Sequence, residues 1–284
     1  MRIELTLENV SFQYTGIGAS DAPVLRDISF TLRPHERVAI VGPSGSGKTT
    51  LIQHFTGLLK PTTGRVLVDG IDIHDKKYSL TLLRRRIGLV FQFPESQLFE
   101  ETVYKDVAFG PVNLELSGEE VAQRVRLALS MTGLDGEAIA ERSPFRLSEG
   151  EKRKVAIAGV LAMQPEMVVL DEPTAGLDPV GVQSMADLMH SLHDRGGTPV
   201  FITHNMDFVA DVAQRVIVLS GGSILFDGTP ERLFSQQSIL ATARLELPNF
   251  IQAFAPYRAA LPQSFQSILS YRQLVRQLQN QPLT

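Results

Sequence analysis

The sequence of 284 residues contains no cysteine and no long apolar run. The absence of cysteine excludes disulfides, zinc–thiolate sites and thiol catalysis, and it fits a reducing compartment. The best apolar candidate, residues 155–163, has nine residues, whereas a membrane-spanning helix needs about 18. Glu4 and Glu8 lie where a signal peptide would be apolar. We therefore expect the chain to stay in the cytoplasm and to reach a membrane only through a partner or a surface patch.

Excess charge of either sign is also small. The sequence has 27 Lys and Arg against 31 Asp and Glu, a net charge of −4, which argues against a protein that coats nucleic acid by bulk electrostatics. Residues 236–284 differ from the rest, because they contain four arginines and one acidic residue, Glu246. This segment carries +3 and residues 1–235 carry −7, so we expect a domain boundary near residue 235.

The spacing of apolar residues predicts an α/β fold. Period-two alternation in residues 1–41 predicts strands, and the apolar spacing from Lys48 through Leu58 predicts a helix. Residues 93–165 are mainly of helical period and are expected to form a helical subdomain, and residues 236–284 a small helical extension. Short apolar runs that alternate with helical stretches predict a parallel sheet covered by helices, and they lie at residues 38–41, 87–91, 167–170, 199–203 and 216–219.

A phosphate-binding loop is predicted where the strand that ends at Val41 meets the following helix. Glycines let successive backbone N–H groups surround phosphate oxygens, and the helix adds the positive end of its dipole. Lys48 would reach the β- and γ-phosphates, while the Thr49 hydroxyl would ligate Mg²⁺. The residues expected to hold nucleotide in this loop are Gly42, Pro43, Ser44, Gly45, Ser46, Gly47, Lys48, Thr49 and Thr50.

A second candidate catalytic motif follows the apolar run 167–170, where the acidic residues Asp171 and Glu172 are adjacent. Asp171 is suited to Mg²⁺, directly or through water. Because side chains alternate along a strand, Glu172 points elsewhere and can polarise an attacking water. Two acids at the end of a strand are often a solvated turn, but the phosphate-binding loop upstream favours the catalytic interpretation.

With these motifs the chain resembles the nucleotide-binding subunits of ATP-binding cassette (ABC) proteins over most of residues 1–235. The resemblance implies a P-loop NTPase fold of ABC type, with a parallel-sheet core, an antiparallel β subdomain and a helical subdomain. It implies that Tyr14 stacks on adenine and that Gln92 senses Mg²⁺ and water and joins the core to the helical subdomain. It also implies that His204 lies at the γ-phosphate and takes part in catalysis with Glu172 and Gln92.

Leu147–Glu151 lies where this family has its signature, usually Leu-Ser-Gly-Gly-Gln. The resemblance implies that Ser148 and Gly150 contact the γ-phosphate of ATP bound to the opposite subunit, and that the loop containing Asp178 crosses the dimer interface. The sequence departs from the pattern at its third and fifth positions, where Glu149 and Glu151 stand. A carboxylate near phosphate is unfavourable unless it turns away or meets a cation, so one alternative is a catalytically weak partner subunit.

Residues 93–113 and the residues around the signature are similar to the A subunits of energy-coupling factor importers, including cobalt- and nickel-uptake ATPases. The resemblance implies a motor subunit on the cytoplasmic face of the membrane that powers uptake of a vitamin or transition-metal ion through separate T and S subunits. Phe93, Leu98 and Phe99 would anchor the T subunit, and the carboxyl-terminal extension would help to hold two ATPases together. Another alternative is a soluble ABC ATPase that works on nucleic acid or ribosomes, although such proteins usually fuse two cassettes.

Of the six histidines, only His204 stands at the end of a predicted strand. His190 and His193 are three residues apart on a predicted helix and are expected on a solvated face, because no further metal ligand is evident. His54 is expected at the surface.

Overall fold

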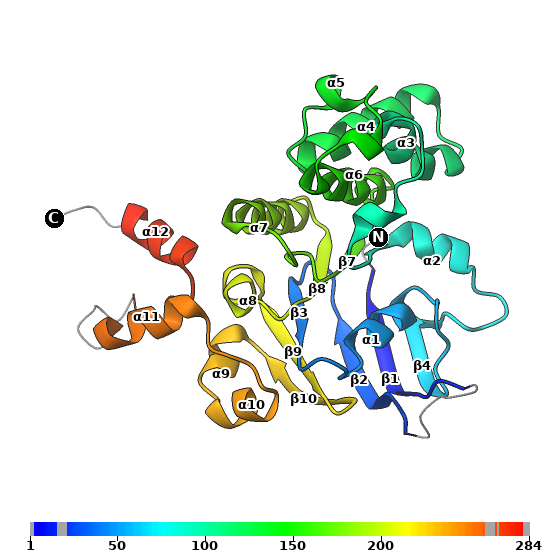
Figure 1. Ribbon diagram of the computed structural model, residues 1–284. Coiled ribbons are helices and arrows are strands. Elements are labelled where there is room, and N and C mark those ends of the chain that lie inside the picture. Colours follow the sequence, from blue (N-terminus) through cyan, green and yellow to red (C-terminus); the bar gives the residue numbers. More distant parts are fainter. Residues whose placement is uncertain (1–2, 16–21, 259–264, 266, 281–284) are drawn as a thin grey trace.

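The protein is built from two sheets, a group of helices beyond one sheet edge and a carboxyl-terminal set of helices (Figure 1). The computed structural model describes residues 3–15, 22–258, 265 and 267–280. This architecture confirms the predicted ABC-type α/β fold with its antiparallel and helical parts.

The central sheet has six strands in the order β10-β9-β3-β8-β7-β6, and all neighbours except β10 and β9 are parallel. Side chains of β3 alternate between two hydrophobic clusters, because successive residues of a strand face opposite sides: Val38 and Ile40 lie in one cluster, Ala39 and Val41 in the other. The strands are β3 (Val38–Val41), β6 (Ile87–Val90), β7 (Met167–Asp171), β8 (Thr198–Ile202), β9 (Arg215–Ser220) and β10 (Ser223–Gly228).

A four-stranded antiparallel sheet covers one face of this core, in the order β2-β1-β4-β5. The helix that follows β3 packs between the two sheets, and Leu51, Ile52 and Phe55 on it are fully buried. The helix ends earlier than its apolar spacing predicts, because Gly57 adopts φ 63 and turns the chain. These elements are β1 (Leu5–Phe12), β2 (Leu25–Leu32), α1 (Lys48–Phe55), β4 (Thr63–Val68), β5 (Ile71–Asp72) and α2 (Leu80–Arg86).

The segment between β6 and β7 is helical. Buried aliphatic side chains such as Val107, Val125 and Ile157 join three of its helices in one cluster that continues into the core. The helices are α3 (Val103–Asn113), α4 (Gly118–Met131), α5 (Gly136–Ile139) and α6 (Glu149–Ala162), with short 3₁₀ turns at Pro94–Gln97 and Pro144–Arg146.

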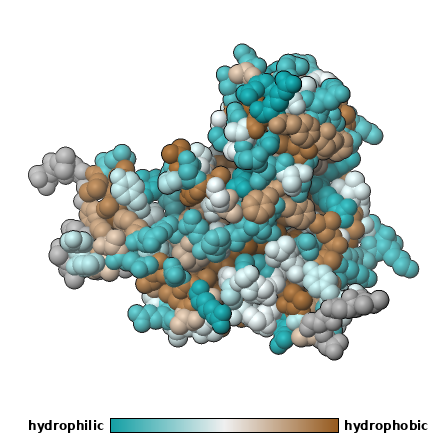
Figure 2. All heavy atoms as spheres, viewed as in Figure 1, coloured by the Kyte–Doolittle hydropathy of each residue, from teal (hydrophilic) through white to brown (hydrophobic). Residues whose placement is uncertain are grey.

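The carboxyl-terminal helices extend away from the core at the left of Figure 1. Arg272 fixes the last of them, because its guanidinium pairs with Asp187 at 2.7 Å and with Asp211 at 3.0 Å. Leu278 on that helix remains 53% exposed, and hydrophobic atoms show at the surface there (Figure 2). The helices after β8 are α8 (Met206–Val212), α9 (Pro230–Phe234), α10 (Gln237–Thr242), α11 (Asn249–Arg258) and α12 (Tyr271–Asn280), and α7 (Pro179–Asp194) precedes β8.

Part of the predicted extension, namely residues 259–264, 266 and 281–284, lies outside the described residues. In the described part of the chain, no helix combines the length and the hydropathy that crossing a bilayer requires.

Two expectations about histidines are wrong. His54 is fully buried, because α1 packs between the sheets, and its Nδ1 donates to the Thr50 carbonyl at 2.8 Å. His190 and His193 are partly buried at the junction of α7 with the core. His193 Nδ1 lies 3.0 Å from Arg37 Nη1, and burial, with nearby arginines such as Arg37, lowers the pKa of His190 to about 4.

Candidate nucleotide-binding site

The loop between β3 and α1 has positive φ angles, which glycine adopts most easily, at Gly42, Gly45 and Gly47. Gly42 has φ 146, and a Cβ there would lie 2.0 Å from the Leu219 carbonyl oxygen. Gly47 has φ 99, and a Cβ there would meet Leu25 and Val24 at 2.8 and 3.0 Å. The glycines therefore allow the loop to turn tightly against neighbouring strands and to present its backbone to a ligand.

Lys48 begins α1 and folds back over this loop. Its Nζ donates to the carbonyls of Gly42 at 2.8 Å and Pro43 at 3.0 Å. Burial lowers the pKa of Lys48, while the neighbouring carboxylates of Glu172 and Asp171 act in the opposite direction. A partly buried ammonium group that is held by carbonyls and faces a loop of backbone amides is suited to a polyphosphate.

Thr49 and Asp171 come together from distant parts of the sequence. The Thr49 hydroxyl donates to Asp171 Oδ2 at 3.0 Å. Asp171 ends β7 and is 5% exposed, and this burial raises its pKa although the Thr49 hydrogen bond opposes the shift. The two groups supply the oxygen donors that a hard cation prefers. Thr49 and Asp171 would hold Mg²⁺ here; no cluster of three or more His, Cys, Asp or Glu side chains that could hold a metal ion exists among the described residues.

Glu172 and His204 form the second contact of the site. Glu172 adopts φ 48, a left-handed conformation that turns the chain after β7. Its Oε2 accepts a hydrogen bond from His204 Nδ1 at 2.9 Å, since an ionised carboxylate can only accept. The Glu172 side chain is 15% exposed and that of His204 is 75% exposed. The carboxylate is thus held in place while the imidazole stays accessible.

These groups meet because the carboxyl ends of parallel strands lie on one edge of the sheet. They surround a pocket of about 370 Å³. Val24 and Ile202 line it too, and sequence reasoning missed both. No motif includes Val24, whereas Ile202 ends β8 and immediately precedes Thr203 and His204. The lining residues are Val24, Ser44, Gly45, Gly47, Lys48, Thr49, Thr50, Gln92, Asp171, Glu172, Ile202 and His204.

Apart from Ser148, Gly150 and Asp178, four predicted residues do not line this pocket: Tyr14, Gly42, Pro43 and Ser46. The carbonyls of Gly42 and Pro43 hold Lys48, and Ser46 is 3% exposed, so its side chain faces the protein. Tyr14 stands at the margin of the pocket, 45% exposed, with its hydroxyl 3.1 Å from Thr50 Oγ1. Its ring packs edge-on against Phe12 at 4.9 Å, so a flat face remains for a ligand ring.

The predicted signature residues lie elsewhere. Ser148, Gly150 and Asp178 line a separate pocket of about 300 Å³ between α6 and α7. Glu149 does not line it; its side chain is 75% exposed and pairs with Lys152 at 2.6 Å. The structure therefore divides the predicted nucleotide contacts between two pockets of one chain.

Glu151, at the fifth signature position, forms a capping box with Ser148 at the start of α6. The Ser148 hydroxyl donates to Glu151 Oε2 at 2.8 Å. The spacing Ser-x-x-Glu before a helix is the sequence signal of this motif.

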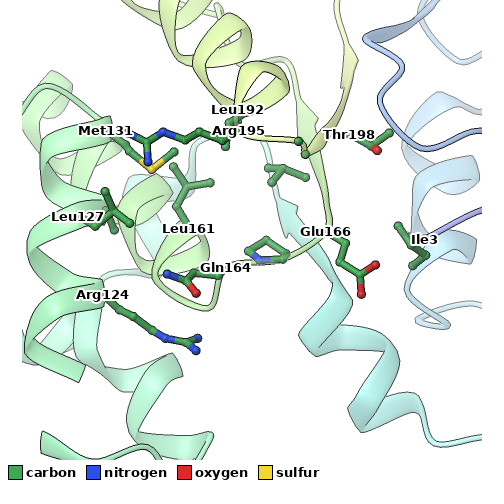
Figure 3. Close-up of a pocket in the computed structure, with 15 residues that line it drawn as sticks. Ile3, Arg124, Leu127, Met131, Leu161, Gln164, Glu166, Leu192, Arg195 and Thr198 are labelled. Atoms are coloured by element: carbon green, nitrogen blue, oxygen red, sulfur yellow. The ribbon is translucent and has the colours of Figure 1, made fainter. Parts of the chain in front are cut away.

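A third pocket, of about 370 Å³, lies at the opposite, amino-terminal edge of the strands. Figure 3 shows Arg124 and Met131 of α4 on one side of it and Glu166 and Thr198 on the other. None of the predicted site residues lines it, so its size does not make it a nucleotide site.

The predicted docking residues are partly exposed. Phe93 and Phe99 are 51% and 56% exposed, and Phe99 packs edge-on against Phe109 at 5.0 Å. Leu98 is 8% exposed and belongs to the hydrophobic core, so the expectation that it anchors a partner is wrong: its apolar side chain packs the helical segment.

Arg153 on the signature helix α6 connects this helix to the segment that contains Phe93 and Glu95. Its guanidinium pairs with Glu95 at 3.3 Å, donates to the Ala175 carbonyl and lies 5.9 Å from the centre of the Phe93 ring. Sequence reasoning missed this contact, because Arg153 and Glu95 are 58 residues apart.

Comparison with known proteins agrees with the fold. The ABC transporter family model matches residues 25–175. The energy-coupling factor transporter ATP-binding protein EcfA2 of Caldanaerobacter subterraneus subsp. tengcongensis is 48% identical over 246 residues, which cover 86% of each chain. The protein of the same name from Symbiobacterium thermophilum is 52% identical over 224 residues, 79% of this chain and 77% of that one.

Solved structures show the same relation. CbiO1 from Clostridium perfringens, part of the ABC transporter complex CbiONQ, has a TM-score of 0.75 and 37% identity, covering 90% of this chain and 100% of that one. A dimeric ATP-binding cassette in a post-hydrolysis state, bound to ADP and Pi, has a TM-score of 0.70 and 32% identity, covering 80% and 98%. The chain therefore belongs to the ABC transporter family, and within it to the ATP-binding proteins of energy-coupling factor transporters.

Proposed function

We propose that this protein is the ATP-hydrolysing motor subunit of an energy-coupling factor importer, and that two such ATPase subunits close on two ATP molecules. The family assignment supports ATP hydrolysis coupled to transport. The observation that supports dimer closure is the division of the nucleotide contacts: the pocket with Lys48 contains neither Ser148 nor Asp178, which line the other pocket. One chain thus supplies two halves of different sites.

The phosphate-binding loop and Lys48 perform the binding step. Lys48 Nζ exchanges one of its carbonyl acceptors for phosphate oxygens, which are stronger acceptors because they are charged. Tyr14 stacks on the adenine ring from the pocket margin. Thr49 and Asp171, joined at 3.0 Å, would hold Mg²⁺. When bound, this ion neutralises charge on the β- and γ-phosphates.

Glu172 and His204 perform the hydrolytic step. The Glu172 carboxylate accepts a hydrogen bond from the attacking water and so orients a lone pair of the water oxygen toward the γ-phosphorus. His204 Nδ1 holds that carboxylate at 2.9 Å, so the carboxylate does not rotate away from the water. Gln92 lies just after the end of β6 and lines the same pocket. It would transmit the presence of the γ-phosphate to the adjoining Phe93.

Membrane subunits would receive this signal. CbiO1, which is similar in fold, belongs to a transporter complex. The exposed rings of Phe93, which directly follows Gln92, and of Phe99 offer apolar anchors of the kind that dominate protein interfaces. We propose that they contact a transmembrane T subunit, that an S subunit binds the vitamin or metal ion, and that the ATPase is peripheral on the cytoplasmic face.

The decisive experiment compares the wild-type protein with Glu172→Gln in MgATP. We expect turnover in the wild type and none in the variant, while ATP binding and ATP-dependent dimerisation survive, because the amide keeps the shape but cannot accept a proton. Absence of turnover in the wild type, even with its membrane partners, would refute the motor function. Mass spectrometry of complexes purified in mild detergent identifies those partners and shows whether a second A subunit is present.

The alternative of a catalytically weak subunit rests on the signature carboxylates, of which Glu149 replaces the usual glycine. Its carboxylate is 75% exposed and is neutralised by Lys152 at 2.6 Å, which favours a working signature. Glu149→Gly tests this: turnover within about twofold of the wild type supports a working site, whereas a gain of tenfold or more, ~1.4 kcal/mol, would support the alternative.

A further inference from the structure

At the start of α6, the Ser148 hydroxyl donates its hydrogen bond to the Glu151 carboxylate. Glu151 Oε2 accepts hydrogen bonds from the Ser148 backbone N–H at 2.9 Å and from the Ser148 hydroxyl at 2.8 Å, while Ser148 Oγ accepts the Glu151 N–H at 3.3 Å. The Ser148 N–H and hydroxyl lower the pKa of Glu151, so its carboxylate is charged at neutral pH and can only accept. The single hydroxyl proton of Ser148 is therefore already in use.

Ser148 and Glu151 both line the pocket between α6 and α7. A γ-phosphate of ATP held by a second subunit would need the Ser148 hydroxyl as a donor, and the Glu151 carboxylate competes with it for the same proton. The two anions also repel one another, by ~1 kcal/mol at about 4 Å in water and more in a closed interface.

We propose that Glu151 is a positioning residue that holds the Ser148 hydroxyl in a hydrogen bond until a phosphate oxygen of ATP on the partner subunit replaces Glu151 as the acceptor. Glu151 thereby sets the ATP concentration at which the subunits close. This inference rests on the proposed function. On closure, the hydrogen bond from Ser148 Oγ to Glu151 breaks and one to a phosphate oxygen forms. The Ser148 N–H remains on Glu151, and the Glu151 N–H remains on Ser148 Oγ, so α6 keeps its cap.

The chain contains a matched control at the start of α4. Ser117 and Glu120 form the same capping box, with distances of 3.1, 2.8 and 3.3 Å in the same order. Neither residue lines a pocket that contains predicted nucleotide contacts. Replacing Glu120 with glutamine therefore weakens a helix cap as Glu151→Gln does, without changing any group near ATP.

The experiment uses the full chain in the Glu172→Gln background, so that hydrolysis does not disturb the equilibrium. Dimerisation is followed by sedimentation velocity across a MgATP titration. We expect Glu151→Gln to lower the half-saturating ATP concentration by about five- to tenfold, which corresponds to ~1 to 1.4 kcal/mol. Glu120→Gln should leave it unchanged, although both variants lower the thermal unfolding midpoint by similar amounts.

The outcomes separate the two claims. An unchanged or higher ATP requirement in Glu151→Gln overturns the inference, and so does an equal shift in Glu120→Gln, which would make helix capping the cause. If the Glu172→Gln parent never dimerises at saturating MgATP, the proposed function fails and the inference fails with it.

Discussion

The ion pair between Arg153 and Glu95 offers a direct test of how the signature helix is held. The two side chains are 9% and 13% exposed, so Arg153→Met would leave the Glu95 carboxylate buried without a partner. Breaking a buried pair in this way costs about 3–5 kcal/mol, a large fraction of the ~5–15 kcal/mol by which domains are stable. Methionine keeps the apolar stem of arginine, so the loss reports on the charge and its hydrogen bonds.

Urea denaturation followed by far-ultraviolet circular dichroism measures this loss, since the chain has no tryptophan to serve as a fluorescent probe. The neighbouring Lys152→Met is the control. Its pair with the exposed carboxylate of Glu149 should contribute at most ~1 kcal/mol.

The double variant Arg153→Met with Glu95→Gln isolates the interaction. Removing the unpaired charge should recover at least ~1 kcal/mol relative to the sum of the single variants. If Arg153→Met is within ~1 kcal/mol of the wild type, or if the two losses simply add, then Arg153 does not link α6 to the segment after Gln92 and the reasoning is refuted.

Three further predictions follow from other contacts. Tyr14→Ala should raise the KM for ATP by about tenfold with little change in kcat, because stacking on a base contributes ~1–3 kcal/mol; an unchanged KM would remove Tyr14 from the site. Since the pKa of His190 is about 4 in the folded state and ~6.5 in the unfolded chain, the unfolded state binds more protons in between, and stability should fall as the pH is lowered from 6.5 to 4. His190→Gln should flatten this dependence in urea titrations at several pH values, and an identical slope would contradict it. Arg272→Ala should release α12 from Asp187 and Asp211, seen as faster limited proteolysis after residue 258, and equal cleavage rates would contradict the tether.

Local sequence was sufficient to predict the tight glycine turn between β3 and α1, because its residues form one contiguous segment. Gly42 and Gly47 stand where side chains would collide with backbone, and Lys48 is placed by the same turn. The helical segments were predicted for a similar reason, since apolar residues recur at helical spacing within each segment. Val125 of one segment and Ile157 of another lie in the same hydrophobic core.

Expectations failed where burial depends on what packs from outside the segment. His54 looked like a surface residue because histidine is polar, but the antiparallel sheet closes over its face of α1. Leu98 looked like a docking residue, but it is covered by the helical segment.

The sequence by itself determined which groups are available: a loop of amides with Lys48, a hydroxyl at Thr49, and the adjacent acids Asp171 and Glu172. Only the tertiary structure decided their partners. The parallel sheet brings Thr49 within 3.0 Å of Asp171, which is 122 residues away, and the fold places Ser148 in a different pocket, between α6 and α7. The physical reason is that motif chemistry is encoded by neighbours along the chain, whereas distances between motifs are set by strand order and helix packing.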